Sequence, residues 1–110
     1  MEFDAVRELA RGIPGIEEST SRGVWSLKVR GKLLACPAIH KSAEPGSLVV
    51  KLGLDQRAEL IEADPDVYYV TDHYLKYPSV LVRVSRIHRD ALRGLLDMAL
   101  KFTNDESKSR

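Results

Sequence analysis

Hydrophobic residues near the N-terminus recur at intervals of three and four, which is the spacing of a helix with one buried side. Gly12 follows this repeat, and glycine commonly ends helices. The pattern therefore predicts a helix over residues 3–11. Its expected buried stripe consists of Phe3, Val6, Leu9, Ala10 and Ile13.

A different pattern follows, in which apolar and polar residues alternate as they do in strands with one buried face. Trp25, Leu27 and Val29 share one side of the first such segment. Lys28 and Arg30 lie on its opposite side. Together with the shorter apolar runs further along, the alternation predicts strands over residues 24–29, 33–38, 47–52, 67–71 and 79–84.

A short helix is expected after the third of these strands. Asp55 is suited to cap its N-terminus, because an Asp side chain can accept a hydrogen bond from the first turn. The Asp64-Pro65 pair ends it, since the residue before a proline is disfavoured in a helix. The side predicted to be buried carries Leu54, Ala58 and Ile61.

The clearest helical repeat lies near the C-terminus. Leu92, Leu95, Leu96 and Ala99 form one apolar stripe, which predicts a helix over residues 89–103. Asn104 is a residue that can end this helix. Residues 104–110 are almost entirely polar, so we expect them to form a disordered tail.

The expected order of elements is α-β-β-β-α-β-β-α. Because neighbouring strands are joined by short connections, the sheet should be mostly antiparallel, with the helices gathered on one face. The sequence thus predicts an α+β two-layer sandwich. We expect a single domain over residues 1–103, which is an ordinary size for one hydrophobic core.

Composition narrows the function classes. The chain has 110 residues, 17 basic and 16 acidic, for a formal net charge of +1. A positively charged surface can therefore form only if the fold groups the basic residues on one side. Cys36 is the only cysteine and has no partner for an internal disulfide. The chain opens without a signal-peptide pattern, and no apolar run approaches the roughly 20 residues that span a bilayer. We therefore expect a cytoplasmic protein without membrane contact.

Several sequence runs, taken in order, resemble the MmcQ/YjbR-like family. The resemblance extends over about residues 3–102. It implies an α-β-β-β-α-β-β-α layer pair related to secretion-chaperone-like domains, and a DNA-binding role with hairpins described as a double wing. It implies no catalytic motif. The runs are IPGIEEST (13–20), VRGKLLA (29–35), LVVKL (48–52), YVTDHY (69–74) and YPSVLVRV (77–84).

Basic residues on the strands suggest how such a domain would contact DNA. Strand periodicity directs them to the sheet face that the helices leave uncovered. There they would hold phosphates by charge-assisted hydrogen bonds. The alternative is that they only keep a solvent-facing sheet soluble, as polar residues on such faces do. The candidate nucleic-acid contacts are Lys28, Arg30, Lys51 and Arg83, with Lys32 at a hairpin tip.

A second interpretation comes from a different functional class. The open sheet or a free strand edge would pair with another protein or with a second copy of the chain. Tyr74 and Tyr77 lie in a polar connection and are candidates for a surface aromatic cluster. Both interpretations remain open at this stage.

Enzymatic chemistry is not expected. Cys36 and His40, with His73 assisting, could be a thiol and its base, but nothing in their spacing makes the side chains meet. Asp72 and Glu44 beside these histidines do not show the close ligand pairs of structural zinc sites. We expect no catalytic residue, no cofactor and no bound metal.

Overall fold

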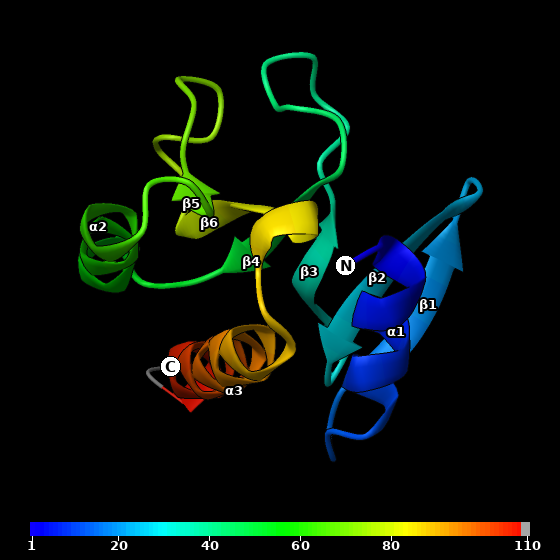
Figure 1. Cartoon of the computed structure of the whole chain (residues 1–110). Coiled ribbons are helices and arrows are strands. Elements are labelled where there is room, and N and C mark those ends of the chain that lie inside the picture. The colour runs from blue at the N-terminus through cyan, green and yellow to red at the C-terminus, as the bar shows by residue number, and fades with distance from the viewer. Residues whose placement is uncertain (109–110) are drawn as a thin grey trace.

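The computed structural model describes residues 1–108 of the chain (Figure 1). Over these residues the chain is α+β, as predicted, with three α-helices, one short 3-10 helix and six strands. In chain order the elements are α1 (Phe3–Arg11), β1 (Glu17–Ser21), β2 (Val24–Val29), β3 (Lys32–Pro37), β4 (Ser47–Lys51), α2 (Leu54–Ala63), β5 (Tyr68–Tyr69), β6 (Ser79–Arg83), η1 (Val84–Arg86) and α3 (Arg89–Lys108).

The strands form one sheet in the order β1-β2-β3-β4-β6-β5, and every pairing is antiparallel. α3 packs against β2, β3 and β4, α1 against β1 and α3, and α2 against β5 and β6. The helices therefore gather on one side of the sheet, as Figure 1 shows. We call the opposite side, which no helix covers within residues 1–108, the open face.

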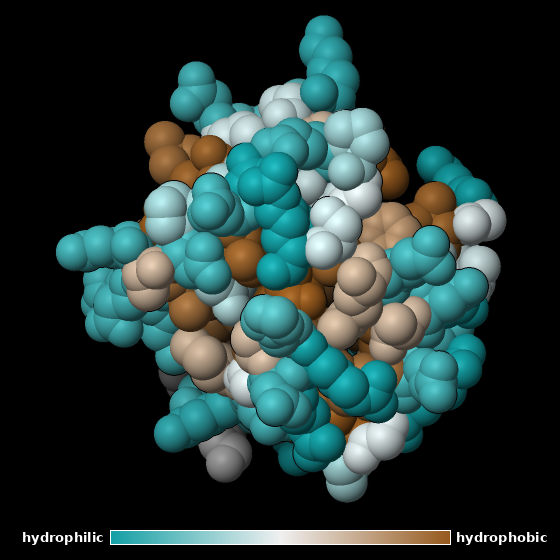
Figure 2. All heavy atoms as spheres, in the orientation of Figure 1, coloured by the Kyte–Doolittle hydropathy of each residue, from teal (hydrophilic) through white to brown (hydrophobic). Residues whose placement is uncertain are grey.

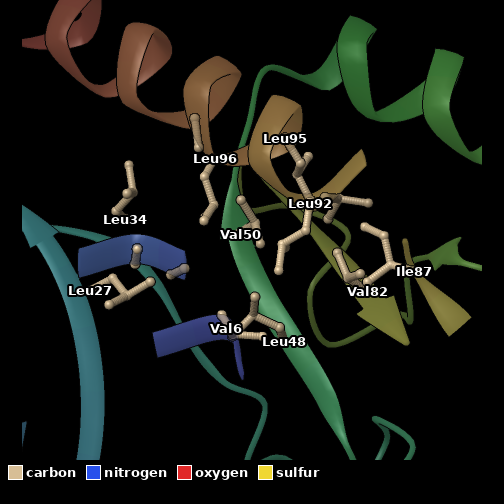
Figure 3. Packing of buried hydrophobic residues seen from close by; sticks show 14 of the residues in the cluster. Val6, Leu27, Leu34, Leu48, Val50, Val82, Ile87, Leu92, Leu95 and Leu96 are labelled. Carbon is tan, nitrogen blue, oxygen red and sulfur yellow. The ribbon is translucent and has the colours of Figure 1, made fainter. Parts of the chain in front are cut away.

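The hydrophobic core lies between the sheet and the helices. The predicted stripe of α3 is buried, with Leu92, Leu96 and Ala99 fully enclosed. Figure 3 shows Leu92 and Leu96 reaching toward Val50 of β4. Most of the surface outside this core is hydrophilic in the view of Figure 2, with hydrophobic residues showing between the polar ones.

Strand β1 has no counterpart in the predicted elements. Its sequence, EESTS, is mostly exposed and carries no apolar residue, so hydrophobic alternation could not reveal it. It is an edge strand that pairs with β2 through the backbone, from Glu17 opposite Lys28 to Ser21 opposite Val24. The turn between them has positive φ at Arg22 and Gly23, as tight type I′ hairpins require.

A bulge in β3 decides which residues reach the open face. Leu27 pairs with Ala35 but the next residue, Lys28, pairs with Leu33, so Leu34 has no opposite residue. Leu34 and Ala35 are consequently both buried, although they are adjacent in a strand. The same shift leaves Leu33 exposed on the open face.

Helix α2 differs from its prediction in both cap and buried side. Its N-cap is Gly53, and Asp55 lies in the first turn. Leu54 and Ala58 are exposed, whereas Arg57 is the buried residue. The prediction was wrong because Arg57 is buried through hydrogen bonds to backbone carbonyls, which hydrophobic periodicity does not register.

The C-terminal segment is helical rather than disordered as far as Lys108. Asn104 does not end α3, and Thr103 just before it is fully buried. Glu106 forms an ion pair with Lys51, which ties the last turns to the sheet. Residues 109–110 of the predicted tail lie outside the described part of the chain. No helix in residues 1–108 is long and apolar enough to cross a bilayer.

Candidate binding surfaces on the open face

Four of the predicted cations lie toward one end of the sheet. Lys28 of β2 and Lys51 of β4 lie on either side of β3. Arg30 lies in the β2–β3 turn with positive φ, and Lys32 is the first residue of β3. We call these four residues the basic end.

The four cations of the basic end differ in how far carboxylates compensate them. Lys51 Nζ lies 3.2 Å from Glu106 Oε1. Lys28 lies directly opposite Glu17 in the β1–β2 pairing. Arg30 and Lys32 are exposed, and within residues 1–108 neither forms an ion pair. Of the four, these two are therefore the cations most available to an anionic partner.

Arg83, the fifth predicted cation, lies apart from the basic end. It is at the far end of β6, and its Nε donates a hydrogen bond to Glu44 Oε2 at 2.9 Å. Its guanidinium also donates to the carbonyls of Pro65 and Asp66. The guanidinium carbon, Cζ, lies 4.1 Å from the centroid of the Tyr69 ring. The hydrogen bond from Arg83 lowers the pKa of Glu44 below its usual value. These contacts make Arg83 a link between three segments of this protein.

A groove of about 390 Å³ lies on the open face, over strands β3 and β4 and beside two loops. The loops, residues 38–46 and 70–78, rise next to each other in Figure 1. Lys51 is the only charged residue of the lining, and the remainder is apolar or aromatic apart from one serine and one cysteine. The lining residues are Val24, Leu33, Cys36, Pro37, Ile39, Val49, Lys51, Tyr74, Tyr77, Pro78 and Ser79.

Two histidines hold the loops together at the rim of the groove. The rings of His40 and His73 are stacked, with centroids 3.5 Å apart and planes 7° from parallel. Ser42 Oγ lies 2.8 Å from His40 Nδ1 and 2.9 Å from the hydroxyl of Thr71. Tyr74 contacts both histidines edge-on. We call the His40–His73 stack the histidine clasp.

The charge state of the clasp follows from its surroundings. The backbone N–H of Ser42 donates to His40 Nδ1, so this nitrogen carries no proton in the observed arrangement. Burial lowers the pKa of His40, and the nearby His73 and Lys41 lower it further. His40 is therefore an uncharged ring when the clasp is closed at neutral pH.

Arg57 of helix α2 anchors the loop of residues 70–78. Its guanidinium is only 9% exposed and donates to the carbonyls of Leu75, Tyr77 and Ser79 at 3.0 to 3.2 Å. This arrangement presents Tyr74 and Tyr77, which line the groove side by side with Pro78. The predicted aromatic pair is thus brought to one surface, where the rings form a wall of the groove.

The sequence could not have revealed the groove, the clasp or the role of Arg57. Each depends on residues that are far apart in the chain: 33 positions for the histidine pair, 18 to 22 for Arg57 and its acceptors, and up to 55 for the groove. His40 and His73 are single histidines in polar stretches, and the stacking partner of each is invisible without the fold. The sequence pointed to this region through Tyr74 and Tyr77 as a surface pair, whereas His40 and His73 were considered only as catalytic or metal-binding groups and not as a ring pair.

The thiol of Cys36 is not set up as a nucleophile. Burial raises its pKa, which favours the neutral thiol. Within residues 1–108 no hydrogen bond joins it to His40 or His73. The described residues also contain no cluster of three or more His, Cys, Asp or Glu side chains that could hold a metal ion.

The fold defines a class of protein: a small α+β domain with helices on one face of an antiparallel sheet and an uncovered opposite face that carries a groove. Residues 11–101 match the model of the YjbR family, which is most of the chain. The chain therefore belongs to the YjbR family, as its sequence resemblance indicated. Searches of curated proteins and of solved structures returned no match.

Proposed function

We propose that this chain is a non-enzymatic, cytoplasmic binding module that contacts DNA phosphates through the basic end. The observation that carries the proposal is the pair of exposed cations, Arg30 and Lys32, at the tip of one hairpin. Lys28 and Lys51 flank them on the same end of the sheet. The resemblance to DNA-binding MmcQ/YjbR-like proteins, with their double wing of hairpins, supports the same conclusion.

The chemistry of the hairpin tip suits phosphate rather than base recognition. The guanidinium of Arg30 can donate two parallel hydrogen bonds to one phosphate, and Lys32 supplies a point charge. Such contacts position a protein on the duplex without reading its sequence. The tight turn keeps both side chains at the tip, where a duplex can approach.

The number of available cations limits the affinity. Arg30 and Lys32 would neutralise about two phosphates. If phosphates also displaced Glu17 from Lys28 and Glu106 from Lys51, the number would rise to about four. The logarithm of the binding constant should then fall with the logarithm of salt concentration with a slope between about −2 and −4. We expect a dissociation constant on the order of 10 μM or weaker at moderate salt.

Fluorescence anisotropy of a labelled duplex at low and moderate salt tests this proposal. Arg30→Glu should weaken binding at least tenfold at low salt and leave the thermal midpoint near that of the native chain. Arg22→Glu is the matched control, because Arg22 is exposed in the other hairpin turn, also has positive φ and gives the same change in charge. Absence of binding at low salt, or equal losses for the two variants, would contradict the proposal.

Association with another protein is a second candidate function, of a different class. The apolar groove favours it, because a groove of this composition offers little to a phosphate backbone. Apart from Lys51 the two candidates use different residues, so variants at those other residues test each one alone.

A further inference from the structure

We infer that the open face is a self-association surface for two copies of the chain related by a two-fold axis. The groove of each copy receives Ile39 of the other. This goes beyond the proposed contact with DNA and does not depend on it. The residues that line the groove are mainly apolar and come from strands β2, β3, β4 and β6 and from the two loops beside them. The residues proposed for DNA are cations, and Lys51 is the one that also lines the groove.

Exposed apolar side chains concentrate at the groove. Within the described residues, six large hydrophobic residues are exposed, and four of them line this one surface. Ile39 is the extreme case, because 80% of it is exposed even though it lines the groove. Scattered exposed hydrophobics are ordinary, whereas a contiguous group marks an interaction site. The four are Val24, Leu33, Ile39 and Tyr77.

A second copy is the occupant that the shape favours. The same face carries an apolar hollow and, on its wall, an apolar side chain that projects into solvent. A surface with both features can pair with itself about a two-fold axis, because each contact between the two copies then occurs twice with the roles of the copies exchanged. Ile39 of each chain would enter the groove of the other.

The charges around the groove also permit pairing with a copy. Lys41 on the first loop and Asp72 and Lys76 on the second are exposed, so the rim carries both signs. A two-fold axis can set a lysine of one copy near Asp72 of the other, whereas a rim of one sign would repel itself. The net charge of +1 adds no appreciable repulsion between copies.

The open face is large enough for a specific contact. The molecule measures 31 × 30 × 28 Å along its principal axes. One side of a body of this size offers roughly 800 Å², which is the area that each partner contributes to a standard interface. A contact restricted to the groove and the loops beside it, which leaves Arg30 and Lys32 free, uses part of this area and falls at the small, weak end of the size range of specific complexes.

The walls of the groove are already ordered before a partner arrives. The histidine clasp joins the two loops, and Arg57 anchors the loop that carries Tyr74 and Tyr77. A preformed site loses little conformational freedom on binding. Association should therefore need no rearrangement of the loops.

Sedimentation velocity from about 10 μM to 1 mM protein, at low salt and at 1 M salt, tests the inference. The native chain should shift from monomer to dimer as concentration rises, and the shift should persist at high salt because apolar contacts carry it. Ile39→Glu should remain monomeric over this range. Leu54→Glu is the matched control, because Leu54 is 53% exposed on α2 and does not line the groove.

The inference fails if the native chain stays monomeric at 1 mM. It also fails if Ile39→Glu dimerises as well as the control, or if mass grows without limit, which would indicate head-to-tail contacts. Leu33→Lys, at a second exposed position of the lining, provides an independent variant should Ile39→Glu fold poorly. A monomer that still binds DNA would overturn this inference alone, and a dimer that binds no DNA would overturn only the proposed function.

Discussion

Replacing Arg57 by Met should destabilise the protein more than the same replacement of an exposed arginine. Methionine keeps an unbranched apolar stem of similar length, so the change removes mainly the guanidinium. Arg57 is only 9% exposed, and its three acceptors all belong to the segment that leads into β6. The variant therefore isolates one buried cation and three backbone carbonyls.

The three carbonyls differ in what their loss would cost. The Ser79 carbonyl is buried with the guanidinium, and leaving such a group unpaired costs about 1–3 kcal/mol. The carbonyls of Leu75 and Tyr77 lie in an exposed loop, where water can replace the arginine, so each contributes roughly 0.5 kcal/mol. The expected loss in the free energy of unfolding is about 2–4 kcal/mol, or roughly 8–16 °C in the thermal midpoint of a domain this size.

Urea and thermal unfolding followed by circular dichroism would measure the effect. Arg93→Met is the matched control, because Arg93 is exposed on α3 and forms one i,i+4 ion pair with Asp97; its loss should cost less than about 0.5 kcal/mol. Arg57→Lys should fall between the two, since an ammonium group cannot reach three carbonyls at once. An Arg57→Met variant as stable as the control would show that Arg57 does not hold this loop.

Three further predictions concern the histidine clasp and two glycines. The lowered pKa of His40 means that the unfolded chain binds a proton at this residue more readily than the folded chain does. The free energy of unfolding should therefore be highest above pH 6.5, the ordinary pKa of histidine, and should decline as the pH falls below it. Thermal midpoints between pH 4.5 and 8 would measure this, and His40→Asn should show a weaker decline; identical profiles would contradict the role of the clasp. Gly94→Ala should stabilise α3 by about 0.5–1 kcal/mol, because the added Cβ meets nothing within 4 Å. Gly31→Ala should destabilise by about 1 kcal/mol, because its φ of +77° strains any other residue; equal effects in denaturant titrations would refute this reasoning.

Hydrophobic periodicity predicted the elements that bury a complete apolar stripe. Helix α1 has the predicted bounds, β2 also does, and the stripe of α3 is buried as expected. The same signal does not exist for β1, whose side chains are polar on both faces. Hydrophobic periodicity predicts the wrong buried side for α2, because the buried residue there is Arg57 and its hydrogen-bond acceptors are backbone carbonyls.

The open face was less predictable than the core because it depends on register. Period-two alternation would have set Leu34 and Ala35 on opposite faces, but the bulge buries both. The strand-face argument assigned Arg83 to the cations without the knowledge that Glu44, 39 residues earlier, would pair with it. Sequence patterns identify which residues are polar, while the register decides which of them remain available.

Salt dependence separates the two functions proposed for the open face. Contacts between the basic end and phosphates release counterions, so they should weaken steeply as salt rises. Burial of Ile39 in an apolar groove involves no charge, and added salt does not screen it. Lys51 is the one residue common to both surfaces, and its ion pair with Glu106 couples it to α3. Binding lost in salt therefore reports on Arg30 and Lys32, and association that survives salt reports on the groove.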